Sequence, residues 1–381
     1  MLYPNSKQLE RVRRERSFSP VNLWQRALAK RWIRFMVFAT YGFVVLLMCA
    51  LGWFYFTEQG TRVRGIVAEA VYTSKQTKYT WLLVGQSGVE KIKASFMRQA
   101  EENHLAKQDM SLVKVATPPS SELVPSQLVR VEDIKGENYV GKIMYVKDPR
   151  YIHVVASNNP GGEKLSNMAV RHNSLAAING GGFFLADKQA SMSGPEYENI
   201  DYIMEPLGIV MSEGKLVEGT NQPTNDIVGF TNSGVLISGR YTVEEMNKLG
   251  VREAVSFLPR LIVNGKRMIT ENDGGWGVGP RTAIAQKADG TVMFLVIDGR
   301  AIHSFGATLR DVQEELLARG AVNAVNLDGG SSSGMYYKGK LITTPSGIHG
   351  EKPLPNAFVV YNPEAEPDGI AAAMEQGKPR S

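Results

Sequence analysis

Residues 291–330 read TVMFLVIDGRAIHSFGATLRDVQEELLARGAVNAVNLDGG. An apolar run opens this stretch, and a second apolar run closes it. Between them, Leu309, Val312 and Leu316 share one face of a helix that Gly320 would end. This order predicts a strand, a helix and a strand that pack together in one domain.

Outward from this stretch, short β-like runs broken by glycine extend from about residue 129 to 361. A second helix is predicted to begin near Thr242, with Glu245 completing a capping box, and to end at Gly250. We therefore expect a mixed α/β (α+β) fold that is rich in strands and holds a few helices. The candidate strands include GKIMYVK, YIHVVAS, SLAAIN, GIVMS, TAIAQK, AVNAVNLD and NAFVVYN.

The N-terminal part has the pattern of a membrane anchor. Residues 35–56, FMVFATYGFVVLLMCALGWFYF, contain no charge, and a helix of this length spans roughly 33 Å. Residues 1–34 carry nine Lys and Arg against two Glu. By the positive-inside rule, we expect this basic arm in the cytoplasm and the rest of the chain outside the cell membrane.

The remaining organisation follows from composition. Residues 57–115 are predicted to form a stalk or small helical region, and 116–128, rich in proline and serine, a linker. The rest of the chain is predicted to form a folded domain at 129–361 and a polar, disordered tail at 362–381.

Several protein classes are excluded by counts. The single cysteine, Cys49, rules out an intramolecular disulfide framework. Beyond the basic arm the chain carries slightly more acidic than basic residues, which argues against nucleic acid as a partner. Hydrophobic residues make up 43% of the chain, enough for a sizeable core.

Polar groups stand beside glycine at the end of several apolar runs. In AAINGGGFF, Asn179 ends a run, Gly181 lets the backbone approach a ligand, and Phe183 offers a flat wall for a sugar. The alternative is a tight turn with the aromatic rings in the core. Further on, Arg281 precedes a strand-like run, and its planar guanidinium suits binding of an anionic oxygen pair. The alternative is that Arg281 forms a salt bridge at the surface.

Two acidic residues follow predicted strands. Asp298 directly follows an apolar run, where it is a candidate site residue or a partner of Arg300. Asn326 and Asp328 alternate with Leu327 and therefore face the same side of their strand. The turn after them is rich in hydroxyl and N–H donors and suits an anion; its residues are Gly329, Gly330, Ser331 and Ser332.

The same turn formally matches G-x-S-x-G, with Ser332 as the nucleophile of a hydrolase. A strand rather than a helix is predicted after it, which argues against that interpretation. The five histidines show no zinc spacing. We expect no cofactor; calcium or magnesium, should either bind, has candidate oxygen ligands in Asn272, Asp273, Asp298 and Asp328.

Taken in order, AAINGGGFF, PRTAIAQKADG, LVIDGR, TLRDVQEELLARGA, AVNAVNLDGGSSSGM and KPLPNAFVV resemble the phosphodiester glycosidase family, from about residue 129 to 361. The resemblance implies hydrolysis of the bond between a sugar's anomeric carbon and a phosphodiester oxygen. It implies catalytic roles for Arg281, Asp298 and Asp328. The residues that it implies for substrate binding are Asn179, Gly181, Phe183, Asn326, Gly329, Gly330, Ser331 and Ser332.

An envelope glycopolymer or exopolysaccharide is the expected substrate, because the chain has an anchor and no cysteine in its folded part. Two alternatives remain open. The domain could bind polysaccharide at the cell surface and assist its assembly without catalysis, or it could be a Ser332 hydrolase.

Overall fold

The chain's structure is a computed structural model that describes residues 20–72, 77–116, 124–187, 202–219, 225–270, 273–347 and 349–364. The chain divides into two compact units at Gly65 and Ile66. The predicted tail from residue 365 onward and most of the predicted linker, residues 117–123, lie outside the described residues.

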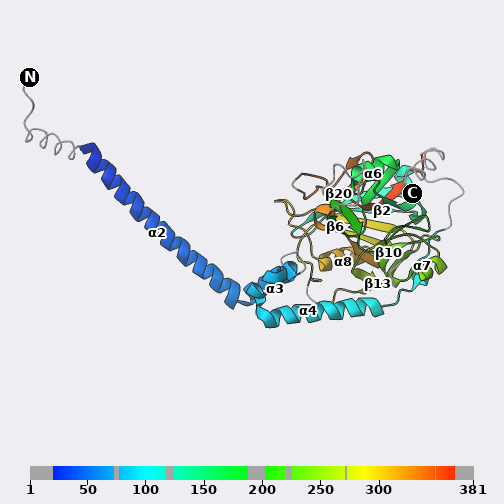
Figure 1. Cartoon of the computed structure of the whole chain (residues 1–381), viewed down its shortest axis with the longest axis horizontal. Coiled ribbons are helices and arrows are strands. Elements are labelled where there is room, and N and C mark those ends of the chain that lie inside the picture. The colour runs from blue at the N-terminus through cyan, green and yellow to red at the C-terminus, as the bar shows by residue number, and fades with distance from the viewer. Residues whose placement is uncertain are drawn as a thin grey trace, which may run out of the picture. The chain divides into compact units, whose positions relative to one another are not determined.

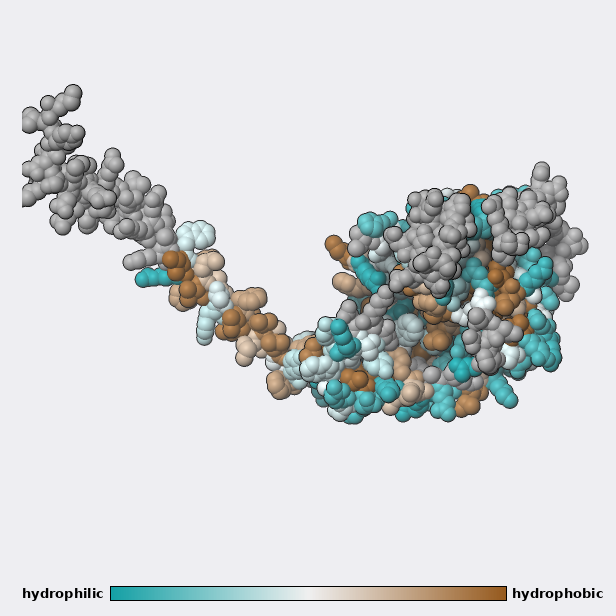
Figure 2. All heavy atoms as spheres, viewed as in Figure 1, coloured by the Kyte–Doolittle hydropathy of each residue, from teal (hydrophilic) through white to brown (hydrophobic). Residues whose placement is uncertain are grey.

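The first unit is dominated by the helix α2, Pro20–Phe56. Its segment Arg31–Phe56 is long and apolar enough to cross a bilayer, and an 18-residue window within it has a mean hydropathy of 2.2. Figure 2 shows brown and pale atoms along this segment. A second helix, α3, Glu58–Tyr72, follows Thr57, whose hydroxyl donates to the Trp53 carbonyl at 2.7 Å.

In its described residues the second unit holds three large sheets and two two-stranded ones, and the predicted mixed, strand-rich fold is confirmed. The main sheet has the order β1-β2-β16-β15-β17-β13-β14. Its strands are β1 Val129–Lys135, β2 Val140–Val146, β13 Arg260–Val263, β14 Lys266–Arg267, β15 Arg281–Lys287, β16 Val292–Ile297 and β17 Ala321–Leu327.

Two five-stranded sheets pack with it. The β5 sheet has the order β19-β18-β5-β21-β3, and the β10 sheet has the order β11-β10-β12-β8-β9. The first is made of β3 Ile152–Ala156, β5 Ser174–Asn179, β18 Met335–Tyr337, β19 Lys340–Leu341 and β21 Asn356–Tyr361. The second is made of β8 Val210–Ser212, β9 Lys215–Glu218, β10 Asn225–Thr231, β11 Leu236–Tyr241 and β12 Val251–Ser256.

Smaller elements complete the unit. Two short pairs join β4 with β20 and β6 with β7. The bounds are β4 Glu163–Lys164, β6 Phe183–Asp187, β7 Tyr202–Pro206 and β20 Pro353–Leu354. The helices are α4 Trp81–Leu105, α5 Pro125–Leu128, α6 Leu165–Arg171, α7 Val243–Lys248 and α8 Leu309–Ala318, with 3₁₀ turns η1 Thr77–Tyr79, η2 Met110–Leu112, η3 Pro149–Tyr151 and η5 Gly330–Ser332.

The core lies on both faces of the main sheet. On one face, Ile284 and Phe294 join Ile178 and Phe358 of the β5 sheet in a fully buried cluster. On the other face, α8 buries its apolar stripe, in which Leu309, Val312 and Leu316 are fully buried as predicted. Side chains that alternate along each strand pack into the two clusters in turn. Because both faces are buried, the sequences of these strands are continuous apolar runs.

The predicted strand–helix–strand unit forms, but one strand separates its two strands. β15 lies between β16 and β17 and is antiparallel to both, so β16 and β17 run in the same direction. Arg281 of β15 pairs with Ile297, and Thr282 pairs with Leu327. The ends of β16 and β17 and the beginning of β15 therefore meet at one edge of the main sheet.

Residues 66–115 belong to the same compact unit as the sheets. Figure 1 shows α4 running alongside the strands. After α4 the chain lies on the unit through hydrogen bonds of Gln108: its amide donates to the Leu236 carbonyl at 2.6 Å and accepts from the Ser238 N–H at 2.9 Å. The Asn264 amide donates to the Lys107 carbonyl at 2.9 Å.

Candidate active site

The three residues that the sequence assigns to catalysis come from one edge of the main sheet. By the register, Arg281 lies beside Asp328, and Pro280 lies beside Asp298. Because neighbouring strands lie about 4.8 Å apart, the Cα atoms of Asp298 and Asp328, two strands apart, are separated by about 10 Å. The backbones of Arg281, Asp298 and Asp328 thus come together where the strands end.

Asp328 is half-buried, and its carboxylate is held by its own turn. Its Oδ1 accepts from the Gly329 N–H at 3.0 Å, and its side chain also hydrogen-bonds Ser332. Burial raises the pKa of Asp328, while Ser332 and the nearby ammonium of Lys352 oppose that rise. The site therefore contains a carboxyl group that is harder to ionise than an exposed one.

Asp298 is buried beside the β5 sheet's loops. Its Oδ1 accepts from the Thr344 N–H at 3.0 Å, and its carbonyl accepts from the Ser304 hydroxyl at 2.5 Å. The half-exposed His303 ring lies with Nε2 4.0 Å from Oδ2. The carboxylate therefore engages Thr344 and faces His303, and no ion pair with Arg300 is present among the described residues.

Arg281 is buried and largely occupied by the protein backbone. Its Nε donates to the Ala307 carbonyl at 3.0 Å, and Nη2 donates to the carbonyls of Trp276 at 2.8 Å and Gly277. Burial lowers the pKa of Arg281 to about 10, which still leaves it protonated at neutral pH. Its Nη1 points toward the turn, 3.9 Å from where a side chain at Gly329 would begin.

Arg300 is a second cation at this turn that the sequence interpretation did not assign to the site. It is exposed, and no hydrogen bond or ion pair of its guanidinium is found in the described part of the chain. The group lies beside Gly330, whose φ of 64° and missing side chain allow the approach. Arg300 itself has φ 57°, an uncommon conformation for a residue with a side chain.

The signal for Arg300 was present in the sequence as the residue after Asp298 and Gly299. Its proximity in the chain to an aspartate favoured an ion pair with Asp298, whereas the left-handed backbone turns its side chain toward Gly330 and Arg281 instead. Lys352 was missed too. Its ammonium lies 4.6 Å from the ring centroid of Phe183 and acts electrostatically on Asp328.

Asn179 braces the site rather than facing a ligand. Its Nδ2 donates to the Asp328 carbonyl at 2.6 Å, and its Oδ1 accepts from the Thr282 hydroxyl at 2.8 Å and the Gly334 N–H at 3.2 Å. Every polar atom of this fully buried amide is thereby engaged. Asn179 thus fastens the β5 sheet to the two main-sheet strands that carry Arg281 and Asp328.

The glycines after Asn179 are required by packing. The Gly181 N–H donates to Asn356 Oδ1 at 2.7 Å, and a side chain at Gly181 would lie 2.7 Å from the Ser256 carbonyl. Phe183, predicted as a wall for a sugar, packs against a buried cluster on one side and carries Lys352 on its ring.

The serine turn is folded as a 3₁₀ turn, η5, that leads into the strand β18. Several of its N–H groups donate to backbone carbonyls of the protein. The Gly330 N–H donates to the Pro280 carbonyl, the Ser332 N–H to that of Gly329 and the Ser333 N–H to that of Gly330. Ser331 is half-buried, and Ser332 contacts Asp328. The strand after Ser332 differs from the strand-to-helix turn that a nucleophile elbow needs.

Asn326 lies on the same strand face as Asp328, as the alternation predicted. Its Nδ2 donates to the Leu258 carbonyl at 3.1 Å, while its buried Oδ1 has no hydrogen-bond partner within the described parts of the chain. Among the described residues, no group of three or more His, Cys, Asp or Glu side chains could hold a metal ion. Asn272, one of the candidate oxygen ligands, lies outside the described residues.

The helices α3 and α4 pack against the loop before β15, residues 273–280, which supplies carbonyls to Arg281. A side chain at Gly275 would overlap the Phe96 ring of α4. Glu69 of α3 hydrogen-bonds Asp273, and burial together with that carboxylate raises the pKa of Glu69 to about 8. A cavity of about 90 Å³ lies beside this contact; Phe96, Phe257, Arg260 and Trp276 are among its lining residues.

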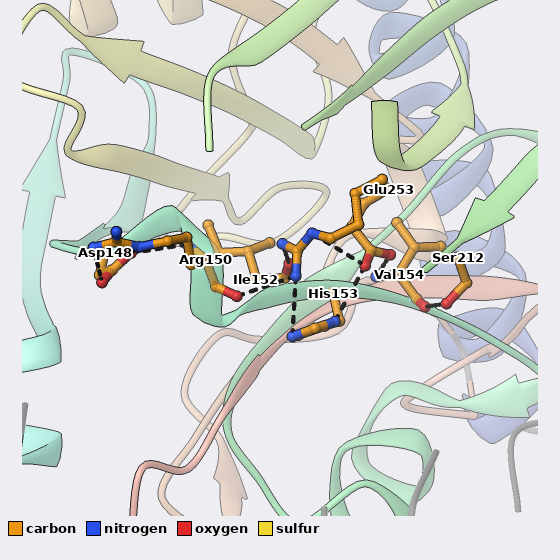
Figure 3. A network of polar contacts seen from close by, with 8 residues as sticks. Asp148, Arg150, Ile152, His153, Val154, Ser212 and Glu253 are labelled. Carbon is orange, nitrogen blue, oxygen red and sulfur yellow. Dashed lines mark hydrogen bonds and ion pairs between the residues drawn. The ribbon is translucent and has the colours of Figure 1, made fainter. Parts of the chain in front are cut away.

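A second buried polar cluster lies on other strands. Figure 3 shows Glu253 between His153 and the backbone of Val154: its Oε1 lies 3.1 Å from His153 Nδ1, and its Oε2 accepts from the Val154 N–H at 2.8 Å. His153 also stacks on Tyr361, with ring centroids 4.1 Å apart. These contacts tie β12 to β3, so we assign the cluster a structural role.

The chain is similar in sequence to a known protein family and to several known proteins. Residues 172–361 match the sequence model of the phosphodiester glycosidase family. A Bacillus subtilis SPbeta prophage protein, YomE, is 35% identical over 100 residues, which cover 26% of this chain and 15% of that protein. The bovine N-acetylglucosamine-1-phosphodiester alpha-N-acetylglucosaminidase is 30% identical over 159 residues, 37% of this chain and 30% of that enzyme.

The fold is similar to that of the zebrafish N-acetylglucosamine-1-phosphodiester alpha-N-acetylglucosaminidase catalytic domain, with a TM-score of 0.51 and 21% identity over 65% of this chain and 87% of that one. Residues 172–361 are therefore similar to the phosphodiester glycosidase family, and the resemblance found in the sequence is confirmed. The chain spans less than a third of the length of the bovine relative.

Proposed function

We propose that this protein is a phosphodiester glycosidase that hydrolyses the bond between the anomeric carbon of a sugar and a phosphodiester oxygen. The observation that carries the proposal is the meeting of Arg281, Arg300, Asp298 and Asp328 at one edge of the main sheet. The substrate carries a phosphate on one side of the bond and a sugar on the other. Cations would bind the phosphate, and carboxylates would act on the sugar.

Arg300 is the residue that we expect to bind the phosphate, with Arg281 Nη1 in support. Arg300 has an exposed guanidinium, whereas two of the three nitrogens of Arg281 are engaged by backbone carbonyls. Binding of a dianion or monoanion between two guanidinium groups is charge-assisted and relieves their mutual repulsion. A phosphate held there leaves as the phosphomonoester when the sugar–oxygen bond breaks.

Asp298 and Asp328 would act on the sugar side. One carboxylate stabilises the positive charge that develops at the anomeric carbon, and the other activates the attacking water or attacks directly. The raised pKa of Asp328 suits a group that exchanges a proton during the reaction. His303, 4.0 Å from Asp298, keeps that carboxylate in an electrostatically favourable environment when the ring is protonated.

The location and natural substrate are part of the proposal. The segment Arg31–Phe56 would anchor the chain in the cell membrane, with the basic arm in the cytoplasm and the domain outside. An envelope glycopolymer or exopolysaccharide that contains sugar-1-phosphodiester links would then be within reach. The names of the bovine and zebrafish relatives support N-acetylglucosamine as the sugar with which to begin.

The test is release of N-acetylglucosamine from its 1-(methyl phosphate) diester by the full chain in lipid nanodiscs. Arg300→Ala should lower kcat/KM about 10²-fold, mainly through KM, because a charged contact to the phosphate is lost. Arg300→Lys should recover part of that loss. Arg130→Ala, at an exposed arginine of β1, is the matched control and should have no effect.

Full activity in Arg300→Ala would contradict the phosphate role. Retention of the diester by the wild-type chain without any turnover would support the alternative of a surface polysaccharide-binding protein.

A further inference from the structure

Three exposed apolar side chains lie on two loops at the candidate active site. Ile302 is 100% exposed, Phe305 64% and Val278 49%. We call residues 275–280 and 299–307 the paired loops, because the Gly279 N–H and the Ala307 N–H each donate to the other residue's carbonyl, at 3.2 and 2.9 Å. Exposed apolar groups that form one patch mark a surface for a ligand or a partner.

One of the paired loops carries Arg300, and the other supplies backbone carbonyls to Arg281. The Gly277 carbonyl, next to Val278, accepts from Arg281, and the Arg300 N–H donates to the Phe305 carbonyl at 3.3 Å. Val278 is thus next in sequence to a residue that binds Arg281, and Phe305 itself binds the backbone of Arg300. A ligand whose anionic group contacts Arg300 would have Ile302 and Phe305 close to whatever that anionic group carries.

Ile302 is presented on an ordered turn. Ala301 and Ser304 exchange backbone hydrogen bonds of 3.0 and 3.1 Å, and the Ser304 hydroxyl donates to the Asp298 carbonyl. The same hydroxyl accepts from the Val140 N–H at 3.1 Å. Since the turn is fastened to the site residue Asp298, little conformational entropy remains to be lost when its apolar tip contacts a ligand.

We propose that the substrate is an amphiphile: a sugar-1-phosphodiester whose second ester group is a long alkyl or isoprenoid chain. This inference rests on the proposed function and narrows its substrate class. The phosphate would meet Arg300, the sugar would meet the two aspartates, and the hydrocarbon would run across Ile302, Phe305 and Val278. A chain with a helix apolar enough to enter a bilayer has access to such lipids.

The reaction is hydrolysis and needs no further reactant. Water's oxygen forms a bond to the anomeric carbon, and the bond from that carbon to the phosphate oxygen breaks with its electron pair left on the oxygen. The free sugar and a long-chain phosphate monoester are the products. The proton that water loses is taken up by a carboxylate and passes to solvent or to the departing phosphate.

The experiment compares two substrates of the full chain in nanodiscs: the methyl and the dodecyl phosphodiesters of N-acetylglucosamine. We expect kcat/KM to be about tenfold or more higher for the dodecyl diester, because hydrocarbon is buried against the paired loops. The double variant Ile302→Ser/Phe305→Ser should lose this preference and retain turnover of the methyl diester within about twofold.

The matched control is Val170→Ser/Leu249→Ser, which removes two exposed apolar side chains, 66% and 36% exposed, from α6 and the end of α7. It should leave both substrates unchanged. Equal turnover of the two diesters by the wild type would overturn the inference. So would a loop variant that loses both activities in parallel, because the loops would then serve the site's structure alone.

Binding distinguishes failure of this inference from failure of the proposed function. If neither diester is hydrolysed, the glycosidase proposal fails, and binding of dodecyl phosphate and methyl phosphate is measured, with empty nanodiscs as the blank. Dodecyl phosphate should bind about tenfold or more tightly to the wild type than to the Ile302→Ser/Phe305→Ser variant. Equal binding to the two would remove the amphiphile site as well.

Discussion

Asp328 illustrates how the site is assembled from residues distant in sequence. Its alternation with Leu327 correctly places it on one face of a strand with Asn326. Its environment comes from elsewhere: Asn179 holds its carbonyl at 2.6 Å, and Lys352 lies near enough to act on its charge. Such partners are 149 residues away for Asn179 and cannot be read from local pattern.

We expect Asp328→Asn to reduce kcat by between about 10² and 10⁴-fold, since a carboxyl group that transfers a proton or attacks the sugar is lost. The same variant should be more stable at neutral pH. Burial raises the pKa of Asp328 in the folded state, so stability falls as the pH rises through that pKa, and the cost of the buried charge is fully present above it.

Measurement of kcat and of the thermal unfolding midpoint in parallel checks this prediction. The conservative change at an exposed aspartate, Asp289→Asn, should alter neither quantity. A variant at position 328 that keeps its activity, or one that is less stable than the wild type at neutral pH, would count against a buried, ionised catalytic carboxylate.

The two arginines of the site, Arg281 and Arg300, show that residue type alone did not predict which guanidinium is accessible. Arg281 was selected because a planar guanidinium suits a phosphate, yet its buried donors hold the carbonyls of Trp276, Gly277 and Ala307. Pairing of Arg300 with Asp298 was one alternative that the sequence offered, yet the guanidinium of Arg300, whose backbone φ is 57°, lies beside Gly330. Residue type predicted the charge of the site, and backbone conformation decided which arginine is accessible.

At the level of elements, local rules were reliable. The capping box of Thr242 and Glu245 begins α7 as predicted, and α8 has the predicted apolar face. α8 also begins with a capping box of Thr308 and Asp311, in which aspartate replaces the usual glutamate. The position of β15 between β16 and β17 was not predictable, because strand order depends on pairing between distant segments.

The contact between α3 and the loop before β15 predicts a pH effect on stability. The pKa of Glu69 is raised from 4.5 to about 8 in the folded protein by burial and by Asp273. Between these two values the folded state binds more protons than the unfolded state, so wild-type stability should fall as the pH rises through this window. Glu69→Gln should remove that part of the pH dependence.

Thermal unfolding of the full chain in nanodiscs at pH 5 and pH 9 provides the measurement. Glu69→Gln should match the wild type near pH 5 and exceed its unfolding midpoint at pH 9, because only the wild type then carries two facing negative charges. Glu90→Gln, on the exposed side of α4, is the control. Superimposable wild-type and Glu69→Gln profiles would contradict a buried carboxyl pair.

For the molecule as a whole, composition and pattern predicted a strand-rich domain after an apolar helix, and both are present. The sequence did not show that residues 66–115 join the sheets in one compact unit. Side-chain hydrogen bonds of Gln108 and Asn264 contribute to that connection, and such contacts leave no periodic trace in a sequence. The compact unit that holds the sheets thus begins at Ile66.

The central claim is that this site breaks the bond between the sugar and the phosphate oxygen, rather than a bond to phosphorus. Hydrolysis of N-acetylglucosamine 1-(methyl phosphate) in ¹⁸O-labelled water, followed by mass spectrometry of the released methyl phosphate, tests it directly. We predict that the methyl phosphate contains no ¹⁸O from the solvent, because water attacks carbon. One solvent oxygen atom in the methyl phosphate, or in N-acetylglucosamine 1-phosphate released with methanol, would contradict the claim.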